Sequence, residues 1–244
     1  MMKCPTKIIA HRGYSSLYPE NTMHAFKEAV VTGADGIELD VQLSSDGELV
    51  IYHDYNIGRN TDMKGHVCEY TAEELSHIEV HAGKLDIAGE TIPTLRRYFE
   101  FMKDKPVFTN IELKNTELPY EGMEEKLVAL IDEFGMRDKV LFSSFNHRSL
   151  RKLQKLAPDI GCACLEDAHL DGAGAYASER GFKWVNPHHS FINEETLAEL
   201  KAHEVGCQVW TVNDEELMAW LFRHEVSAII TDRPELAFAV REGI

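Results

Sequence analysis

The sequence predicts a TIM-type (β/α)8 barrel, and three observations support this fold class. The chain has 244 residues, 44% of them hydrophobic, which is enough for one large α/β domain with a buried core. Short β-rich runs alternate with longer segments of helical period, as in repeated βα units around a parallel sheet. No G-x-G-x-x-G motif follows the first strand, which makes an open doubly wound sheet the weaker alternative.

The expected elements follow one another along the chain. Helical period is clearest in residues 22–31, 94–103 and 124–134. Eight parallel strands in a chain of about 250 residues are typical of a closed barrel. The strand candidates are residues 8–10, 36–42, 107–113, 139–143, 160–165, 183–186, 208–212 and 228–231.

A further strand, residues 48–53, breaks this alternation. Only residues 44–47 separate it from the preceding strand, which leaves room for a hairpin turn but not for a crossover helix. The strand must therefore return antiparallel and bring His53 to the level of Glu38. Residues 55–90 carry charge and glycine with little periodicity. We expect them to form a small insertion over the barrel mouth within a single domain, 1–244, either shaping a substrate pocket or forming a lid without substrate contact.

The chain is strongly acidic. Lys and Arg total 25 against 41 Asp and Glu, which gives a formal net charge of −16 at pH 7. Such a charge repels nucleic acids and anionic bilayers at long range, so we expect neither as a partner. No segment is long and apolar enough for stable membrane insertion. An anionic substrate would therefore require a local positive patch or a bound metal.

The cysteines indicate a reducing compartment. They are odd in number and lack C-x-x-C spacing, which argues against a disulfide framework or a zinc ribbon. Cys162 and Cys164 share a strand face, where we expect packing rather than redox chemistry. The N-terminal residues lack the apolar stretch of a signal peptide, so we expect a cytoplasmic protein. A homodimer is compatible with the sequence, although no feature demands one. The cysteines are Cys4, Cys68, Cys162, Cys164 and Cys207.

Carboxylates alternate along two of the expected strands. In 36–42, Glu38 and Asp40 share one face, and the apolar opposite face must pack against helices. The carboxylates therefore point to the barrel axis near the C-terminal strand ends, where barrel enzymes hold their sites. Glu112 and Lys114 repeat the pattern from the strand 107–113. Hard oxygen ligands without a thiolate favour Mg²⁺, Ca²⁺ or Mn²⁺. The alternative is a structural ion-pair network with Lys114.

Two histidines also end strands at this mouth. His11 closes the first strand and is followed by Arg12, and His53 closes the hairpin. Two imidazoles with an unperturbed pKa of about 6.5 suit paired general acid and base roles near neutral pH. Arg12 supplies a fork that matches a phosphate group. For His188 and His189, after the strand 183–186, we expect a loop role.

These residues belong to a longer series of motifs. In its order and spacing, the series resembles the glycerophosphodiester phosphodiesterase family. The resemblance is dense up to residue 115, looser in the middle, and returns near the end of the chain. The motifs are His11-Arg12-Gly13, Pro19-Glu20-Asn21-Thr22, Ala25-Phe26, Gly33-Ala34-Asp35, Glu38-Leu39-Asp40-Val41, Asp46-Gly47, His53-Asp54, Arg59, Thr61, Gly65, Ile92-Pro93-Thr94-Leu95, Ile111-Glu112-Leu113-Lys114, Trp210-Thr211-Val212-Asn213 and Thr231-Asp232-Arg233-Pro234.

The resemblance implies a metal-dependent barrel enzyme that cleaves glycerophosphodiesters, such as glycerophosphocholine or glycerophosphoethanolamine, to sn-glycerol 3-phosphate and an alcohol. The nucleophile would be water or the neighbouring glycerol hydroxyl of the substrate, acting through a cyclic phosphate. Carried over position by position, the resemblance makes Glu38, Asp40 and Glu112 metal ligands, His11 and His53 the acid–base pair, and Arg12 and Lys114 phosphate-binding residues.

Some positions keep more than one interpretation. Trp210 is expected to share a strand face with Gln208, where it either walls the glycerol pocket as a substrate-binding surface or packs in the core. Asn21 is most simply the N-cap of the helix that follows it.

Two other functions compete with the diesterase. A lysophospholipase D-like activity on lysophospholipids keeps the barrel and metal, but the acidic charge and the lack of an amphipathic membrane helix disfavour it. A catalytically silent binding barrel would predict a damaged site, whereas every motif residue is present.

Overall fold

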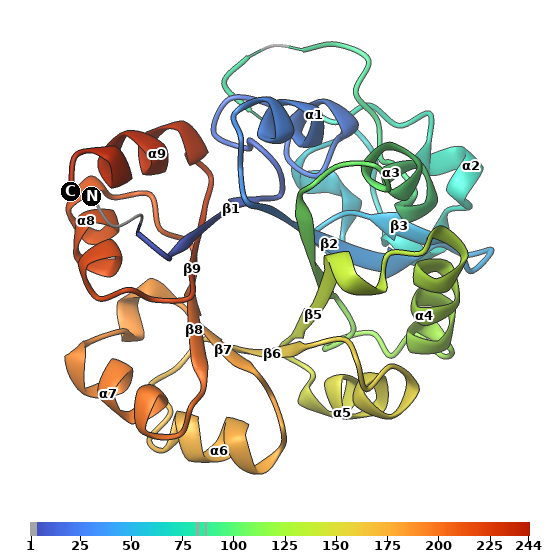
Figure 1. The fold of residues 1–244 in the computed structure, drawn as a ribbon. Helices are drawn as coiled ribbons and strands as arrows, with labels where there is room; N and C mark the ends of the chain where they lie inside the picture. The colour runs from blue at the N-terminus through green and yellow to red at the C-terminus, as the bar shows by residue number, and fades with distance from the viewer. Residues whose placement is uncertain (1–3, 82, 86) are drawn as a thin grey trace.

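The computed structural model describes residues 4–81, 83–85 and 87–244, and within them nine strands form one closed sheet. The strands are β1 (Lys7–His11), β2 (Gly36–Leu43), β3 (Leu49–Ile51), β4 (Phe108–Leu113), β5 (Val140–Ser144), β6 (Cys162–Glu166), β7 (Trp184–Pro187), β8 (Gly206–Val209) and β9 (Ala228–Thr231). Eight run parallel in the order β1-β9-β8-β7-β6-β5-β4-β2, and β1 also pairs with β2, which closes the ring. The predicted TIM-type barrel is confirmed (Figure 1).

Helices surround the barrel on its outside (Figure 1). They cover the apolar strand faces, so that Ile37, Leu39 and Val41 of β2 are fully buried among them. The alternate residues Glu38 and Asp40 consequently face the barrel axis. The helices are α1 (Met23–Val31), α2 (Ala72–Leu75), α3 (Leu95–Met102), α4 (Met123–Phe134), α5 (His147–Leu156), α6 (Ala173–Glu179), α7 (Glu194–Ala202), α8 (Glu215–Arg223) and α9 (Pro234–Glu242).

The hairpin after β2 has the predicted direction. β3 pairs antiparallel with β2, and Val41 lies opposite Ile51. The Tyr52 N–H donates to the Asp40 carbonyl at 3.1 Å, so the pairing continues beyond β3. His53 therefore reaches the level of β2 that carries Glu38 and Asp40, as predicted.

The largest error in the predicted strand boundaries lies at β8. β8 spans Gly206–Val209 rather than 208–212, and Trp210 lies beyond its end. The strand begins early because Gly206 pairs beside Trp184 of β7. A Cβ at position 206 would lie 2.4 Å from Trp184 Cδ1, so only glycine allows this approach. The sequence pattern overlooked it because glycine is depleted in strands.

The segment between β3 and α3 holds α2 and two short 3₁₀ turns, η1 (Ile57–Arg59) and η2 (Val67–Glu69). In Figure 1 it lies at the edge of the barrel beside β3 and α3. It is tied to the loop after β4, because the Tyr55 hydroxyl accepts hydrogen bonds from the Thr116 and Glu117 N–H groups at 2.9 and 3.0 Å. Its assignment as an insertion, 55–90, stays a prediction. Its small apolar cluster consists of Val50, Tyr52, Ile57, Val67, Leu75, Val80 and Ile92.

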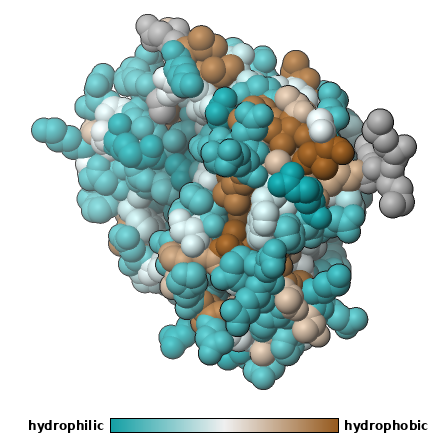
Figure 2. Space-filling view, turned by 90° about the vertical axis from the view of Figure 1, so that its left-hand side faces the viewer, coloured by the Kyte–Doolittle hydropathy of each residue, from teal (hydrophilic) through white to brown (hydrophobic). Residues whose placement is uncertain are grey.

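The outer surface is mixed in character. The face turned to the viewer in Figure 2 is mainly hydrophilic, with apolar residues gathered in smaller patches. Among the residues that the structure describes, none of the helices combines the length and the apolar character needed to cross a bilayer.

The cysteines offer a test of the packing. All five are free, and Cys162, Cys164 and Cys207 are buried, whereas Cys4 and Cys68 are partly exposed. Burial raises the pKa of the Cys207 thiol to about 12, so its reactive thiolate is scarce at pH 8. We expect a thiol-specific reagent such as dithionitrobenzoate to modify only the two partly exposed thiols rapidly, and all five after denaturation. Rapid modification of a third thiol in the native protein would contradict this packing.

Candidate active site

Three carboxylates meet at the C-terminal mouth of the barrel. Glu38 and Asp40 of β2 and Glu112 of β4 each place a carboxylate oxygen within 4.8 Å of the others. The strand register explains the arrangement, because Asp40 pairs with Glu112 and Glu38 precedes Asp40 by two residues on the same face. The structure thus brings together the three side chains that strand alternation singled out.

Two cationic side chains contact these carboxylates. Lys114 Nζ lies 2.8 Å from Glu112 Oε1 and 3.8 Å from Asp40 Oδ1. Arg12 Nε lies 3.5 Å from Asp40 Oδ2, and the Arg12 backbone N–H donates to Glu38 Oε2 at 3.0 Å. The ion-pair network that was the alternative to a metal site is therefore present. It is incomplete, because two cations leave one of the three negative charges uncompensated.

The uncompensated charge falls mainly on Glu38. Burial and the neighbouring carboxylates of Asp40 and Glu112 raise the pKa of Glu38 well above its usual range. Burial opposes ionisation of Asp40 as well, but its attraction to His53, Arg12 and Lys114 brings the pKa of Asp40 below its usual range. Glu38 is thus the carboxyl group that most needs an additional cation to remain ionised.

The polar atoms left without partners fit a bound cation. Glu38 Oε1 and Asp40 Oδ1 are buried and have no hydrogen-bond partner among the described residues. A buried carboxylate oxygen without a partner is costly, and a divalent cation supplies both the missing contact and the missing charge. The donors are all carboxylate oxygens, which suits a hard cation such as Mg²⁺, Ca²⁺ or Mn²⁺.

His11 is oriented by a carboxylate from the end of the chain. Its Nδ1 lies 2.6 Å from Asp232 Oδ1, which also accepts a hydrogen bond from Ser15 Oγ at 2.9 Å. Burial opposes ionisation of Asp232, but the hydrogen bonds from His11, Asn213 and Ser15 lower the pKa of Asp232 below its usual range. The ionised carboxylate holds the proton on Nδ1. The other ring nitrogen of His11, Nε2, therefore faces the carboxylate cluster and lies 3.9 Å from Glu38 Oε2.

His53 is held in the same way. Its Nδ1 lies 2.5 Å from Asp54 Oδ1, and Asp54 Oδ2 accepts a hydrogen bond from Arg59 Nε. Burial opposes ionisation of Asp54, but the hydrogen bonds from His53 and Arg59 lower the pKa of Asp54 to about 2. His53 Nε2 lies 3.3 Å from Lys114 Nζ. Both histidines therefore keep Nε2 toward the site while a carboxylate holds Nδ1.

Glu20 joins the two halves of the site. It accepts hydrogen bonds from Arg12 Nη1 at 2.9 Å and from Arg59 Nη2 at 2.5 Å. Arg12 contacts the carboxylate cluster, and Arg59 contacts the partner of His53. One glutamate therefore connects the phosphate-binding candidate Arg12 with the His53–Asp54 pair.

Asn21 contributes to the site instead of capping a helix. Its Nδ2 donates to Asp40 Oδ2 at 2.8 Å. The N-cap prediction for Asn21 is wrong, because Thr22 precedes α1 and its side chain accepts the hydrogen bond from the Ala25 N–H. Asn21 has a left-handed φ of 58°, a conformation that asparagine tolerates better than most residues.

Trp210 lies half-buried at the mouth. Its Nε1 donates to the Asn186 carbonyl at 2.7 Å. Its ring meets those of Phe145 and His188 edge-on, with centroids 5.7 and 5.0 Å apart. The Phe145 ring lies 6.0 Å from Lys114 Nζ, so this aromatic group borders the carboxylate site. The structure gives Trp210 aromatic neighbours; its contact with substrate stays a prediction.

Asp54, Arg59 and Asp232 occupy motif positions, but the sequence pattern alone assigns them no role. Asp54 follows His53 directly in the chain, so the His-Asp dipeptide could have indicated the hydrogen bond between the two side chains. Asp232 lies 221 residues from His11, and only the pairing of β1 with β9 brings the two together. No local sequence pattern indicates a role for Arg59, because its contacts with Asp54 and Glu20 depend on how the segment after β3 folds.

Known proteins resemble the chain over most of its length. The model of the Glycerophosphoryl diester phosphodiesterase family matches residues 11–236. A protein named glycerophosphodiester phosphodiesterase from Caldanaerobacter subterraneus subsp. tengcongensis is 41% identical, covering 98% of this chain and 99% of its own. A Bacillus altitudinis protein of the same name is 40% identical, with 97% and 98% covered.

A solved structure adds a ligand to this comparison. An Oleispira antarctica phosphodiesterase, determined in complex with the product sn-glycerol-3-phosphate, superimposes with a TM-score of 0.85 at 30% sequence identity. The alignment covers 97% of this chain and 96% of that one.

Proposed function

Since the chain belongs to the glycerophosphoryl diester phosphodiesterase family and is an enzyme of that class, we propose that it hydrolyses glycerophosphodiesters to sn-glycerol 3-phosphate and an alcohol. Glycerophosphocholine and glycerophosphoethanolamine are the proposed substrates. The observation that carries this proposal is the carboxylate triad between two carboxylate-held histidines and two cationic side chains. The product complex of the Oleispira protein supports the identity of the product.

Glu38, Asp40 and Glu112 are proposed to hold a divalent cation of the Mg²⁺, Ca²⁺ or Mn²⁺ class. When bound, such a cation neutralises charge on the transferring phosphoryl group. The unpartnered oxygens of Glu38 and Asp40 support this assignment.

His11 and His53 are proposed to move the protons of the reaction. One histidine starts with Nε2 unprotonated and takes the proton of the nucleophile there. The other starts as the imidazolium and gives its Nε2 proton to the leaving oxygen of the alcohol. Asp232 and Asp54 fix the protons on the opposite ring nitrogens, so each Nε2 starts in the orientation that proton transfer requires.

Arg12 and Lys114 are proposed to bind the phosphate. Both lie against the carboxylate triad, where their charges favour an anionic substrate despite the acidic chain. The nucleophile is water or the glycerol hydroxyl next to the phosphodiester. The second route forms a cyclic glycerol phosphate, which ³¹P NMR of the reaction mixture would display as a transient signal.

Two further proposals concern the segment 55–90 and the cellular location of the protein. We propose that residues 55–90, which carry Arg59 to the edge of the site, help to recognise the alcohol group. We also propose a cytoplasmic location, because five free thiols suit a reducing compartment.

The decisive experiment measures the product formed by the purified protein, which is sn-glycerol 3-phosphate from a glycerophosphodiester and lysophosphatidic acid from a lysophosphatidylcholine. Glycerophosphocholine, glycerophosphoethanolamine and a lysophosphatidylcholine are supplied after chelation, and then after addition of Mg²⁺, Ca²⁺ or Mn²⁺. We expect chelation to stop cleavage of the two glycerophosphodiesters and at least one cation to restore it. Cleavage of the lysophospholipid alone would favour the lysophospholipase D-like function. No cleavage under any condition would favour a silent barrel.

Arg59 provides a test of how His53 is positioned. Arg59→Ala removes hydrogen bonds to Asp54 and Glu20 without removing a group that contacts the reacting atoms. By comparison with residues that orient metal-bound histidines, we expect a loss of about 10- to 100-fold in kcat, with partial recovery in Arg59→Lys.

The matched control is Arg96→Ala, which breaks an exposed arginine–carboxylate pair with Glu133 on the outer surface. Loss of an exposed pair costs roughly 0–1 kcal/mol of stability, so its kcat should stay unchanged. Equal kcat values for Arg59→Ala and Arg96→Ala would contradict a positioning role for Arg59.

A further inference from the structure

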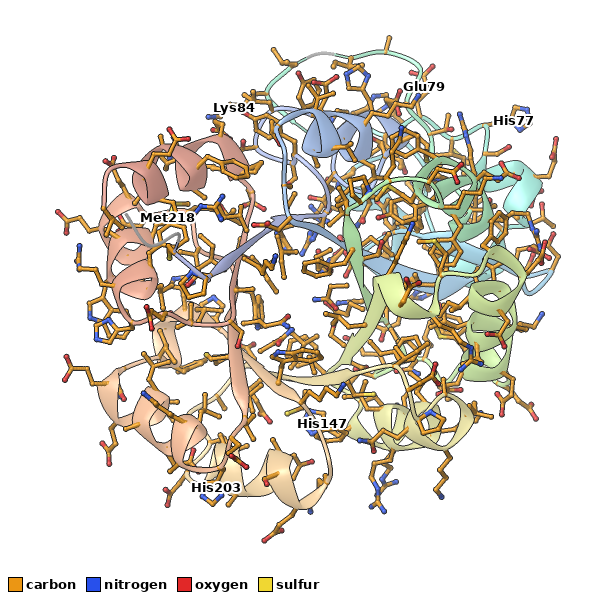
Figure 3. The ribbon with its side chains drawn as sticks, viewed as in Figure 1. His77, Glu79, Lys84, His147, His203 and Met218 are labelled. Atoms are coloured by element: carbon orange, nitrogen blue, oxygen red, sulfur yellow. The ribbon has the colours of Figure 1, made fainter. Side chains whose placement is uncertain are left out.

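A second cluster of metal-ligating side chains lies on the outside of the barrel. It consists of His147 at the start of α5 and of Cys164 and Glu166 on β6, whose ligand atoms lie within 4.8 Å of one another. Cys164 and Glu166 are two residues apart on one strand and therefore share its outward face. Figure 3 shows His147 between β6 and α6. Its ring lies against that of Tyr176, with the two centroids 5.5 Å apart.

Glu166 has an unsatisfied atom in this cluster. Its Oε1 is buried and has no hydrogen-bond partner among the described residues, and it lies 3.9 Å from His147 Nε2. A buried carboxylate oxygen without a partner destabilises the fold unless the group is protonated or meets a cation. Burial raises the pKa of Glu166, which shows the cost of ionising it without a partner.

His147 is arranged to become a ligand through an exchange of tautomers. Its Nε2 lies 3.1 Å from the Leu165 carbonyl and its Nδ1 lies 2.7 Å from the Tyr176 hydroxyl. If the ring proton moves from Nε2 to Nδ1, Nδ1–H donates to the Tyr176 oxygen and Nε2 carries a lone pair. The ring must then turn away from the Leu165 carbonyl for this lone pair to meet a cation. Metal-bound histidines characteristically donate their other ring N–H to a carboxylate, a backbone carbonyl or water. The Tyr176 hydroxyl oxygen would be the acceptor here.

The donor set differs from that of the carboxylate triad. One thiol, one imidazole and one carboxylate are the ligand types of zinc, whereas the all-oxygen triad suits harder cations. Glu166 lines a surface cavity of about 260 Å³. A cation would approach the cluster from this cavity past Glu166, because Cys164 is buried. Asp171 and Glu195 also line this cavity, and their carboxylates attract cations to it.

We propose that His147, Cys164 and Glu166 form a second metal site, which takes a thiophilic divalent cation such as Zn²⁺. On binding, the Sγ–H proton of Cys164 is released to solvent as the sulfur–metal bond forms, and His147 Nε2 and Glu166 Oε1 complete a three-ligand set. No electron is transferred. The three ligands lie on the outer side of the barrel, away from the carboxylate triad at its axis. The proposed second site is therefore independent of the proposed diesterase function.

Cobalt is the appropriate probe because it reports sulfur ligation directly. Co²⁺ bound to a thiolate gives a charge-transfer band in the near ultraviolet, and the carboxylate triad contains no sulfur that could produce it. We expect titration of the chelated, reduced wild-type protein with Co²⁺ to produce this band and added Zn²⁺ to remove it. Absence of the band at saturating Co²⁺ would overturn the proposal.

The chain offers a closely matched control. Cys162 lies two residues from Cys164 on the same buried strand, but its Sγ faces the Leu150 carbonyl outside the cluster. Cys162→Ala should keep the band, and Cys164→Ala should lose it. A band of equal intensity in Cys164→Ala would assign it to another thiol and overturn the proposal.

Glu166→Gln provides a second test that leaves the thiol in place. The amide preserves the shape of the side chain and removes its charge, so we expect at least about tenfold weaker Co²⁺ binding by the absorbing site. Unchanged affinity would remove Glu166 from the ligand set and contradict the site as proposed. Circular dichroism and thermal unfolding of the chelated proteins are measured in parallel, and wild-type spectra with cooperative unfolding in all three variants show that they are folded.

Discussion

Glu38→Gln is expected to abolish cation-dependent turnover while leaving the protein folded. The amide retains an oxygen that can accept the Arg12 N–H, but it removes one of three clustered negative charges. Loss of the bound cation should lower kcat/KM by about 10³-fold or more, because metal stabilisation of a transferring phosphoryl group is worth several kcal/mol. The phosphodiesterase assay with restored cation measures this loss.

Thermal unfolding separates loss of the cation from loss of the fold. In the chelated protein, Glu38→Gln should raise the melting temperature, because Asp40 and Glu112 no longer repel a third charge at the same place. Added cation should stabilise the wild type but not the variant, since only a bound ligand shifts the unfolding equilibrium. The control is Glu117→Gln, an exposed glutamate beyond β4, which should behave as the wild type. Cation-dependent activity near the wild-type level in Glu38→Gln would remove Glu38 from the metal site.

His53→Ala is expected to lower kcat by about 10²- to 10⁴-fold, the usual contribution of a positioned general acid or base. The variant leaves Asp54, Arg59 and the carboxylate triad in place, so cation binding should be retained. The measurement is kcat under saturating substrate and cation. Exposed His77, which lies far from the mouth in Figure 3, provides the matched His77→Ala control with unchanged kcat.

The pairing of His53 with Asp54 predicts a specific pattern of non-additivity. Asp54→Asn alone should lower kcat, because the carboxylate that holds Nδ1–H is lost. In the His53→Ala background the same substitution should have little further effect, since Asp54 acts through the histidine. Additive losses in the double variant would show that Asp54 contributes to catalysis by another route. Near-normal kcat in His53→Ala would contradict the acid–base assignment itself.

The two histidines form equivalent hydrogen-bonded pairs with aspartates from different parts of the chain. His53 has its carboxylate partner at the next residue, whereas His11 depends on Asp232 at the far end of the sequence. The closure of the sheet by β1 and β9 makes the second arrangement available. A truncation that removes β9 would therefore take away both the barrel closure and the partner of His11.

The barrel, the hairpin and the convergence of the carboxylates can all be predicted from the order of the residues. Alternation along β2 and β4 sends Glu38, Asp40 and Glu112 to one side, because successive residues of any strand face opposite directions. That rule is local and can be read from residue order. The count and spacing of strands likewise follow from local periodicity.

The partners of these residues depend on how distant segments pack together. Asn21 contacts Asp40 rather than capping α1, Glu20 joins Arg12 to Arg59, and β8 begins at Gly206 beside Trp184. Each depends on two segments whose approach is set by packing and strand register, neither of which residue order expresses. The cluster around Cys164 has the same origin, because a helix and a strand contribute its ligands. Periodicity predicts which face a side chain occupies, and the closed fold determines what it meets there.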